Sequence, residues 1–137
     1  MNNSIQWNNQ FLIGNDIIDD QHQTLFKIAQ KSNYITDITN IDEQEELLKD
    51  ILHELYEYVE YHFSQEEALM DDILYIDTDN HKQIHKHMLG ELNTLTVEIS
   101  YSKLSEITAK LNEFVQVVFV KHIKIEDQKI SDFIVKN

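Results

Sequence analysis

Apolar residues recur every three or four positions along four stretches of the chain, a pattern typical of helices that bury one face. The first helix is predicted to begin near Asp19 or Asp20, both favourable caps, the second around residues 40–42, the third near residues 77–79, and the fourth after a turn at residues 102–105. The four stripes are Ile18, His22, Leu25, Ala29 and Ser32; Leu48, Leu52, Leu55, Val59, His62, Glu66 and Leu69; His81, His85, Met88, Leu92, Leu95 and Ile99; and Leu104, Ile107, Leu111, Val115, Val118, His122 and Ile125. Histidines and a glutamate therefore continue stripes that are otherwise apolar.

The connections between these stretches are short, and the chain has only two glycines and no proline, so the turns that hairpins and phosphate-binding loops need are almost absent. We therefore expect an all-α fold, an up-down-up-down antiparallel four-helix bundle with an N-terminal arm. A length of 137 residues suits one domain. Its expected parts are an arm over about residues 1–17 that packs across the bundle with Trp7 as an anchor, the bundle over about residues 18–127, and a short C-terminal extension.

The composition limits the chemistry. Without cysteine the chain can form no disulfide, thiolate metal site or iron–sulfur cluster, so metal ligands must be nitrogen and oxygen. A formal net charge of −14 argues against nucleic acid and anionic membranes as partners. The start of the chain lacks the features of a signal peptide, and no apolar run is long enough to span a membrane. We expect a soluble, cytoplasmic monomer.

Helical phase sorts the seven histidines. Positions four apart lie nearly above one another, so His62 with Glu66, and His81 with His85, form two clamps that each face one way. His22 and His122 lie in line with their own core stripes. The remaining two, His53 and His87, lie on the opposite faces of their helices and are expected to face solvent.

Five histidines and a glutamate buried without partners would cost several kcal/mol per unsatisfied group, more than a domain of this size can lose. A bound metal removes this penalty. Five imidazoles are too many for one tetrahedral zinc ion and too few for two closed zinc sites. Two five- or six-coordinate ions that share bridging carboxylates fit the count, and this mixture of ligands favours iron.

The spacing of these residues resembles the ligand pattern of the hemerythrins, closest to the single-domain bacteriohemerythrins. The matching pieces are His22 with Leu25 three residues on, His62-Phe63 followed by Glu66, the pair His81 and His85, and His122-Ile123 followed by Asp127. The likeness covers nearly the whole chain, including the arm that bears Trp7.

The resemblance implies reversible binding of dioxygen, with no catalytic residues, by a protein that stores oxygen or delivers it to oxygen-requiring enzymes. The implied cofactor is two iron ions (Fe2+/Fe3+) bridged by Glu66, Asp127 and an oxo or hydroxo group. One iron would be held by His81, His85 and His122, and the other, which keeps an open position for dioxygen, by His22 and His62. The residues that match the family's oxygen pocket are Leu25, Phe63, Val118, Phe119 and Ile123.

Spacing and resemblance disagree at one ligand. One regular helical turn after His122 comes Glu126, whereas Asp127 lies five positions on and about 140° round an ideal helix. The resemblance favours Asp127, which requires the fourth helix to be widened locally, in the manner of a π-helix, or to end there.

Several other functions can be weighed against the pattern. A sensor of oxygen or redox state, or an iron-buffering protein, could use the same site. A di-iron oxidase or ferroxidase is disfavoured, because ferritin-like sites are rich in carboxylates and use Glu-x-x-His pairs at three-residue spacing. A purely structural acidic bundle would not need five histidines in phase.

Overall fold

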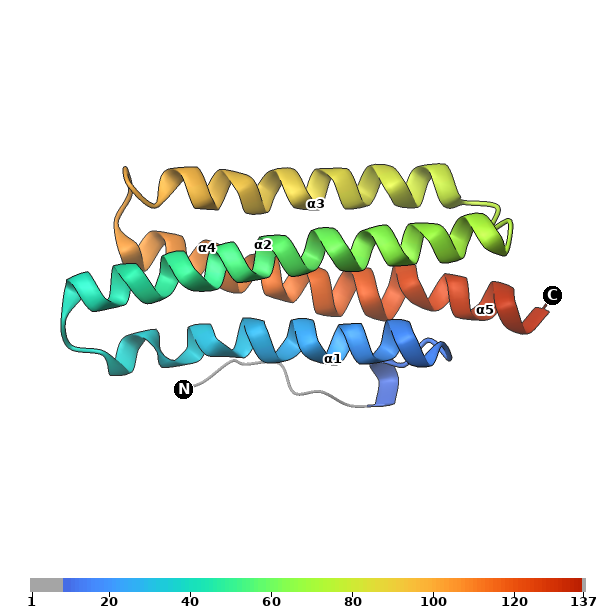
Figure 1. Cartoon of the computed structure of the whole chain (residues 1–137), viewed down its shortest axis with the longest axis horizontal. Helices are drawn as coiled ribbons and strands as arrows, with labels where there is room; N and C mark the ends of the chain where they lie inside the picture. Colours follow the sequence, from blue (N-terminus) through green and yellow to red (C-terminus); the bar gives the residue numbers. More distant parts are fainter. Residues whose placement is uncertain (1–8, 137) are drawn as a thin grey trace.

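The computed structural model describes residues 9–136, in which four helical rods lie side by side and each reverses the direction of the one before (Figure 1). The first three rods are α1 (Asp16–Gln30), α2 (Ile41–Asp72) and α3 (Thr78–Glu98). The fourth consists of α4 (Leu104–Gln116), the π-helix η3 (Val117–Asp127) and α5 (Gln128–Lys136), and two short 3-10 helices, η1 (Asn9–Phe11) and η2 (Lys31–Asp37), flank α1. The predicted all-α, antiparallel four-helix bundle is confirmed.

The helices α2, α3 and α4 begin where the apolar pattern predicts, and Asn40 caps α2 by accepting a hydrogen bond from the backbone of Glu43 (3.1 Å). The predicted start of α1 at Asp19 or Asp20 is wrong. The helix begins at Asp16, because Asn15 caps it with a side-chain oxygen 3.0 Å from the amide of Ile18.

Asp19 instead ties the chain before α1 to the bundle. Its buried carboxylate accepts hydrogen bonds from the backbone amides of Ile13 (2.7 Å) and Gly14 (3.2 Å). Gly14 has a φ of 89°, in the left-handed region that residues with a side chain rarely adopt. This turn places Phe11 and Ile13 in the core, so the described part of the arm packs on the bundle as expected. Trp7 lies outside the described residues.

One end of the bundle is filled by aliphatic side chains with almost no exposure, and we call this part the apolar half. Its most buried members, at 0% exposure, are Leu48, Leu52, Leu92, Ile107 and Leu111. The histidines and the glutamate of the same stripes lie toward the other end, which also holds the loop between α2 and α3 and the start of α1 (Figure 1).

The chain continues as a helix beyond residue 127, where the sequence predicted only a short extension. Ile130 of α5 is fully buried and packs in a small separate core with Met70 and Tyr75. The side chain of Gln128 donates hydrogen bonds to the carbonyls of Gln10 (3.2 Å) and Leu12 (2.5 Å), which join α5 to the arm. Among the described residues, every helix is too short or too polar to cross a membrane.

Candidate metal centre

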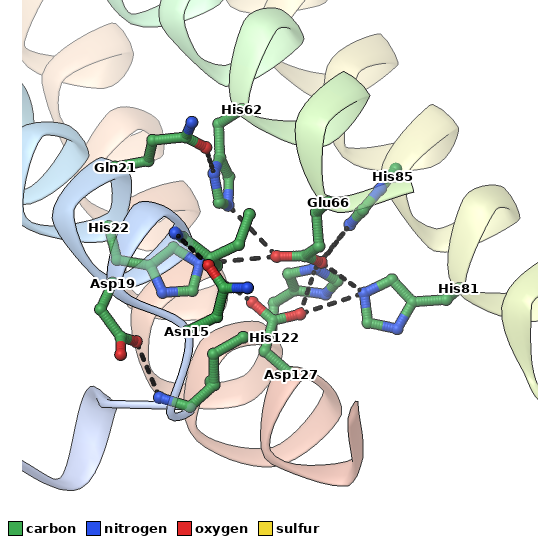
Figure 2. A network of polar contacts seen from close by, with 12 residues as sticks. Asn15, Asp19, Gln21, His22, His62, Glu66, His81, His85, His122 and Asp127 are labelled. Atoms are coloured by element: carbon green, nitrogen blue, oxygen red, sulfur yellow. Dashed lines mark hydrogen bonds and ion pairs between the residues drawn. The ribbon is translucent and has the colours of Figure 1, made fainter. Parts of the chain in front are cut away.

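Seven polar side chains from four helices converge inside the bundle, and none is more than 2% exposed (Figure 2). All five imidazoles direct Nε2 toward two central carboxylates. The seven are His22 from α1, His62 and Glu66 from α2, His81 and His85 from α3, and His122 and Asp127 from η3. The structure therefore brings together every residue that the sequence nominated as a metal ligand.

The two oxygens of Glu66 face different histidines. Oε1 lies 2.8 Å from Nε2 of His81 and 3.1 Å from Nε2 of His85. Oε2 lies 3.3 Å from Nε2 of His62 and 3.5 Å from Nε2 of His22. A carboxylate arranged in this way divides the imidazoles into two groups.

Asp127 makes the same division. Its Oδ1 lies 3.0 Å from Nε2 of His81 and 3.3 Å from Nε2 of His122, whereas Oδ2 lies 3.2 Å from Nε2 of His22. The seven side chains form two overlapping groups, and within each group all the ligand atoms lie within 4.8 Å of one another. One group is Glu66, His81, His85, His122 and Asp127, and the other is His22, His62, Glu66 and Asp127.

The predicted widening of the fourth helix is confirmed, because His122 and Asp127 both lie in the π-helix η3. Its wider turn brings Asp127 into the centre and leaves Glu126 outside, 3.3 Å from Nζ of Lys129. The same shift of phase makes one stripe prediction wrong, since Ile125 is 51% exposed.

The two histidines that helical phase excluded do lie on the surface. The side chains of His53 and His87 are 74% and 76% exposed. Each pairs with a glutamate one turn on, Glu57 at 3.2 Å and Glu91 at 2.7 Å. Neither histidine can take part in the buried centre.

Burial and charge oppose each other at the centre. Burial acts to lower the pKa of His22 and of His81, but the nearby carboxylates of Asp127 and Glu66 outweigh it and raise the two pKa values to about 9 and about 10. Burial also acts to raise the pKa of Glu66, yet the surrounding histidines hold it well below its ordinary value. Protons on His22 and His81 thus balance the carboxylates when no cation does so.

His62 behaves differently from these two. Burial, aided by the neighbouring charge of His22, lowers the pKa of His62 even though Glu66 acts in the opposite direction. One histidine of the centre is therefore neutral and able to offer its lone pair to a cation.

The centre fits metal ions because many of its closely spaced atoms are not hydrogen bonded. Eight buried nitrogen and oxygen atoms of these side chains have no hydrogen-bond partner within the described part of the chain. Five of them face the centre: Nε2 of His22, Nε2 of His62, Oε2 of Glu66, and both carboxylate oxygens of Asp127. A buried polar atom without a partner costs roughly 1–3 kcal/mol, and coordination to a cation satisfies such atoms together.

The comparison with known proteins agrees with this geometry. The hemerythrin HHE cation binding domain matches residues 13–134. The chain belongs to the hemerythrin family. Bacteriohemerythrin of Campylobacter jejuni subsp. jejuni serotype O:6 is 37% identical over 122 residues, which cover 88% of each chain. Bacteriohemerythrin of Clostridium acetobutylicum is 32% identical over 127 residues, or 92% of this chain and 98% of the relative. Myohemerythrin-1 of Phascolopsis gouldii is 28% identical over 123 residues, or 90% and 88% of the two chains.

The apolar residues predicted to form the oxygen pocket are close to the candidate ligands in space or in the chain. Phe63 stacks on the ring of His85, with ring centroids 3.7 Å apart and planes 2° from parallel. Leu25, Val118 and Ile123 are each at most 3% exposed. The side chain of Phe119, the fifth predicted pocket residue, lies outside what the structure describes.

Two polar residues at the centre escaped the sequence analysis. Oε1 of Gln21 lies 2.8 Å from Nδ1 of His62, and Oε2 of Glu67 lies 2.9 Å from Nδ1 of His85. Gln21 is next to His22 in the chain and Glu67 is next to Glu66, but each contacts a histidine on another helix. The helical pattern places both off the core stripes, so only their adjacency to ligands could have drawn attention to them.

Proposed function

We propose that this hemerythrin binds dioxygen reversibly at a non-haem di-iron centre, and that it stores oxygen or delivers it to oxygen-requiring enzymes. The observation that carries the proposal is the division made by Glu66 and Asp127. Each carboxylate turns one oxygen toward one group of imidazoles and its other oxygen toward the other group. Two ions bridged by both carboxylates would use all of these atoms.

The ligands then fall into two positions. The three-histidine position consists of His81, His85 and His122, and the two-histidine position consists of His22 and His62. Glu66, Asp127 and an oxo or hydroxo group would bridge the two. Because the two-histidine position has one protein ligand fewer, it is where dioxygen would bind. Iron in these positions supplies electrons that dioxygen can take up and return.

The chain's own residues would make the binding reversible by keeping the centre dry. Phe63 stacks on His85, and the buried Leu25, Val118 and Ile123 lie within about one helical turn of His22 or His122 in the chain. All four side chains present only carbon atoms. Water there would help a reduced form of oxygen to leave and would strand the irons as ferric ions. The excess of imidazoles over carboxylates supports carriage rather than further activation of oxygen, and the names of the bacteriohemerythrin and myohemerythrin relatives agree with it.

An optical spectrum tests the function directly. The iron-loaded protein is reduced without air, exposed to air, and then flushed with inert gas, and its visible absorption is recorded at each stage. We expect a charge-transfer band that appears with oxygen and disappears when the gas is removed. Turnover of a reductant under oxygen would instead indicate an oxidase, and a band that never reverses would overturn the proposal.

Two neighbouring acidic residues test the ligand assignment. Asp127→Asn removes the charge of a proposed bridge, so the purified protein should hold less iron than the two ions expected of the parent protein. Glu126→Gln is the matched control, because Glu126 points away from the centre and pairs with Lys129. Iron loss from the Glu126 variant alone would show that the ligand is misassigned.

A further inference from the structure

Within residues 9–136, two of the five buried imidazoles have a hydrogen-bond partner on the ring nitrogen that faces away from the centre. Nδ1 of His85 donates to Oε2 of Glu67 (2.9 Å), and Nδ1 of His62 donates to Oε1 of Gln21 (2.8 Å). The corresponding nitrogens of the other three have no partner in the described residues: Nδ1 of His22, Nδ1 of His81 and Nδ1 of His122.

The partnered histidines are distributed evenly, with one in the three-histidine position and one in the two-histidine position. A neutral imidazole carries one N–H, and a carboxylate oxygen only accepts hydrogen bonds. Glu67 therefore accepts a hydrogen bond from the Nδ1–H of His85, and Nε2 of the same ring is the nitrogen that faces the centre, 3.1 Å from Oε1 of Glu66 and 2.9 Å from Nε2 of His122. Gln21 does the same for His62, whose Nε2 lies 3.3 Å from Glu66.

The two partners differ in charge and exposure. Glu67 carries a carboxylate that is 30% exposed in a groove between α2 and α3, whereas Gln21 carries a neutral amide and is 4% exposed. A carboxylate bonded to the far side of a ligating imidazole makes that imidazole a stronger donor to the metal, and an amide does so less.

We infer that Glu67 and Gln21 are positioning residues that preset one imidazole of each metal position before an ion arrives, and that the charge of Glu67 strengthens the three-histidine position. The inference rests on the proposed di-iron function. Both residues also join helices, since Gln21 connects α1 to α2 and Glu67 connects α2 to α3.

The effect of Glu67 on Fe2+ affinity is measured with the full-length apoprotein, without air, in competition with a coloured chelator. Glu67→Ala removes both the acceptor and the charge, and it should weaken Fe2+ binding by about 10–100-fold, the range found for outer partners of metal ligands. Glu67→Gln keeps an acceptor oxygen and loses only the charge, so its affinity should fall between those of the parent and Glu67→Ala. The matched control is Glu57→Ala, which removes a glutamate from the same helix that pairs with the exposed His53, and it should bind Fe2+ as the parent does.

Nitrogen-15 NMR of the histidine rings in the apoprotein provides a readout that a loss of stability would not mimic. We expect Nδ1 of His85 and Nδ1 of His62 to carry a proton in the parent protein. Glu67→Ala should shift the Nδ1 signal of His85 alone, and Gln21→Leu, which removes the amide with little change of volume, should shift that of His62 alone.

The outcomes separate the two proposals. A parent protein that binds no Fe2+ overturns the di-iron function and this inference together. A parent that binds two Fe2+ ions, with Glu67→Ala binding as tightly or with the Nδ1 signal of His85 unchanged, overturns the positioning role alone.

Discussion

The two halves of this bundle bury their inner faces equally well but with opposite chemistry. In the apolar half, Leu52, Leu92 and Leu111 are 0% exposed, and burial itself stabilises the fold. The metal half is the other half of the bundle, which holds the candidate metal centre. There, six of the seven candidate ligands continue the same stripes, and Asp127 joins them through the π-helix. None is more than 2% exposed, but their burial leaves polar atoms without partners in the described part of the chain. Helical phase therefore decides which positions are buried, and residue type decides whether burial stabilises the protein or calls for a cation.

The largest expected effect comes from damaging the apolar half. Leu111→Ala removes a fully buried side chain and should lower the free energy of unfolding by about 2–5 kcal/mol. Because the site of the change is apolar, the loss should be the same with and without iron, as measured by denaturant unfolding. A loss confined to the iron-loaded protein would mean that the two halves are not independent.

Adding iron should stabilise the folded protein through the metal half. Free Fe2+ at 100 times the dissociation constant of one position should stabilise the folded protein by about 2.7 kcal/mol through that position, measured by denaturant unfolding without air. His62→Ala should remove most of the gain from the two-histidine position, since it takes away one of the two histidines there. If iron leaves the unfolding curve of the parent unchanged, the centre does not bind it in the folded state.

Leu25→Ala is the counterpart of Leu111→Ala beside the ligands. It enlarges the space next to the centre, so we expect iron binding nearly intact and an oxygenated form that oxidises on the order of tenfold faster, equivalent to about 1.4 kcal/mol in the barrier. The decay of the charge-transfer band in air measures this rate. An unchanged lifetime of the oxygenated form would show that Leu25 does not help to exclude water from the centre.

Raising the pH should weaken the apoprotein through the metal half. The pKa values of folded His22 and His81, about 9 and about 10, lie above the ordinary 6.5, so the folded state holds protons that the unfolded state loses first. Their contribution to stability is complete below about pH 6.5 and is lost as the pH rises through 9 and 10. Denaturant unfolding of the apoprotein across this window checks the sign, and a stability that rises with pH would contradict it.

Gly90→Ala should have the smallest effect, and a favourable one. A Cβ at this exposed position of α3 meets no atom within 4 Å, and alanine favours the helix over glycine. We expect a gain of about 0.5–1 kcal/mol, equal in the apoprotein and the iron-loaded protein. A loss of stability would show that the added Cβ meets neighbouring atoms that the structure places farther away.

Much of the fold could be predicted because regular helices repeat their buried positions. The stripes that include Leu52, Leu92 and Leu111 keep one phase, so α2, α3 and α4 begin close to their predicted residues. The start of α1 was missed because Asn15 and Asp19 act through single hydrogen bonds that leave no periodic pattern.

The ligand set shows where local reasoning fails. Regular spacing identifies His62 with Glu66 as a clamp, but from His122 it selects Glu126, and only resemblance to a family selected Asp127. Gln21 and Glu67 were missed because their partners lie 41 and 18 residues away, on helices whose rotation the sequence alone does not provide.

The π-helix also sets the orientation of everything that follows it. Removing one residue between His122 and Asp127 would turn the last helix by about 100° around its axis. Ile130 would then leave Met70 and Tyr75, and Gln128 would leave the backbone of Gln10. The π-helix that brings Asp127 into the interior therefore also sets how α5 packs on the bundle. A change that restored a regular helix would disturb both the centre and the packing of α5.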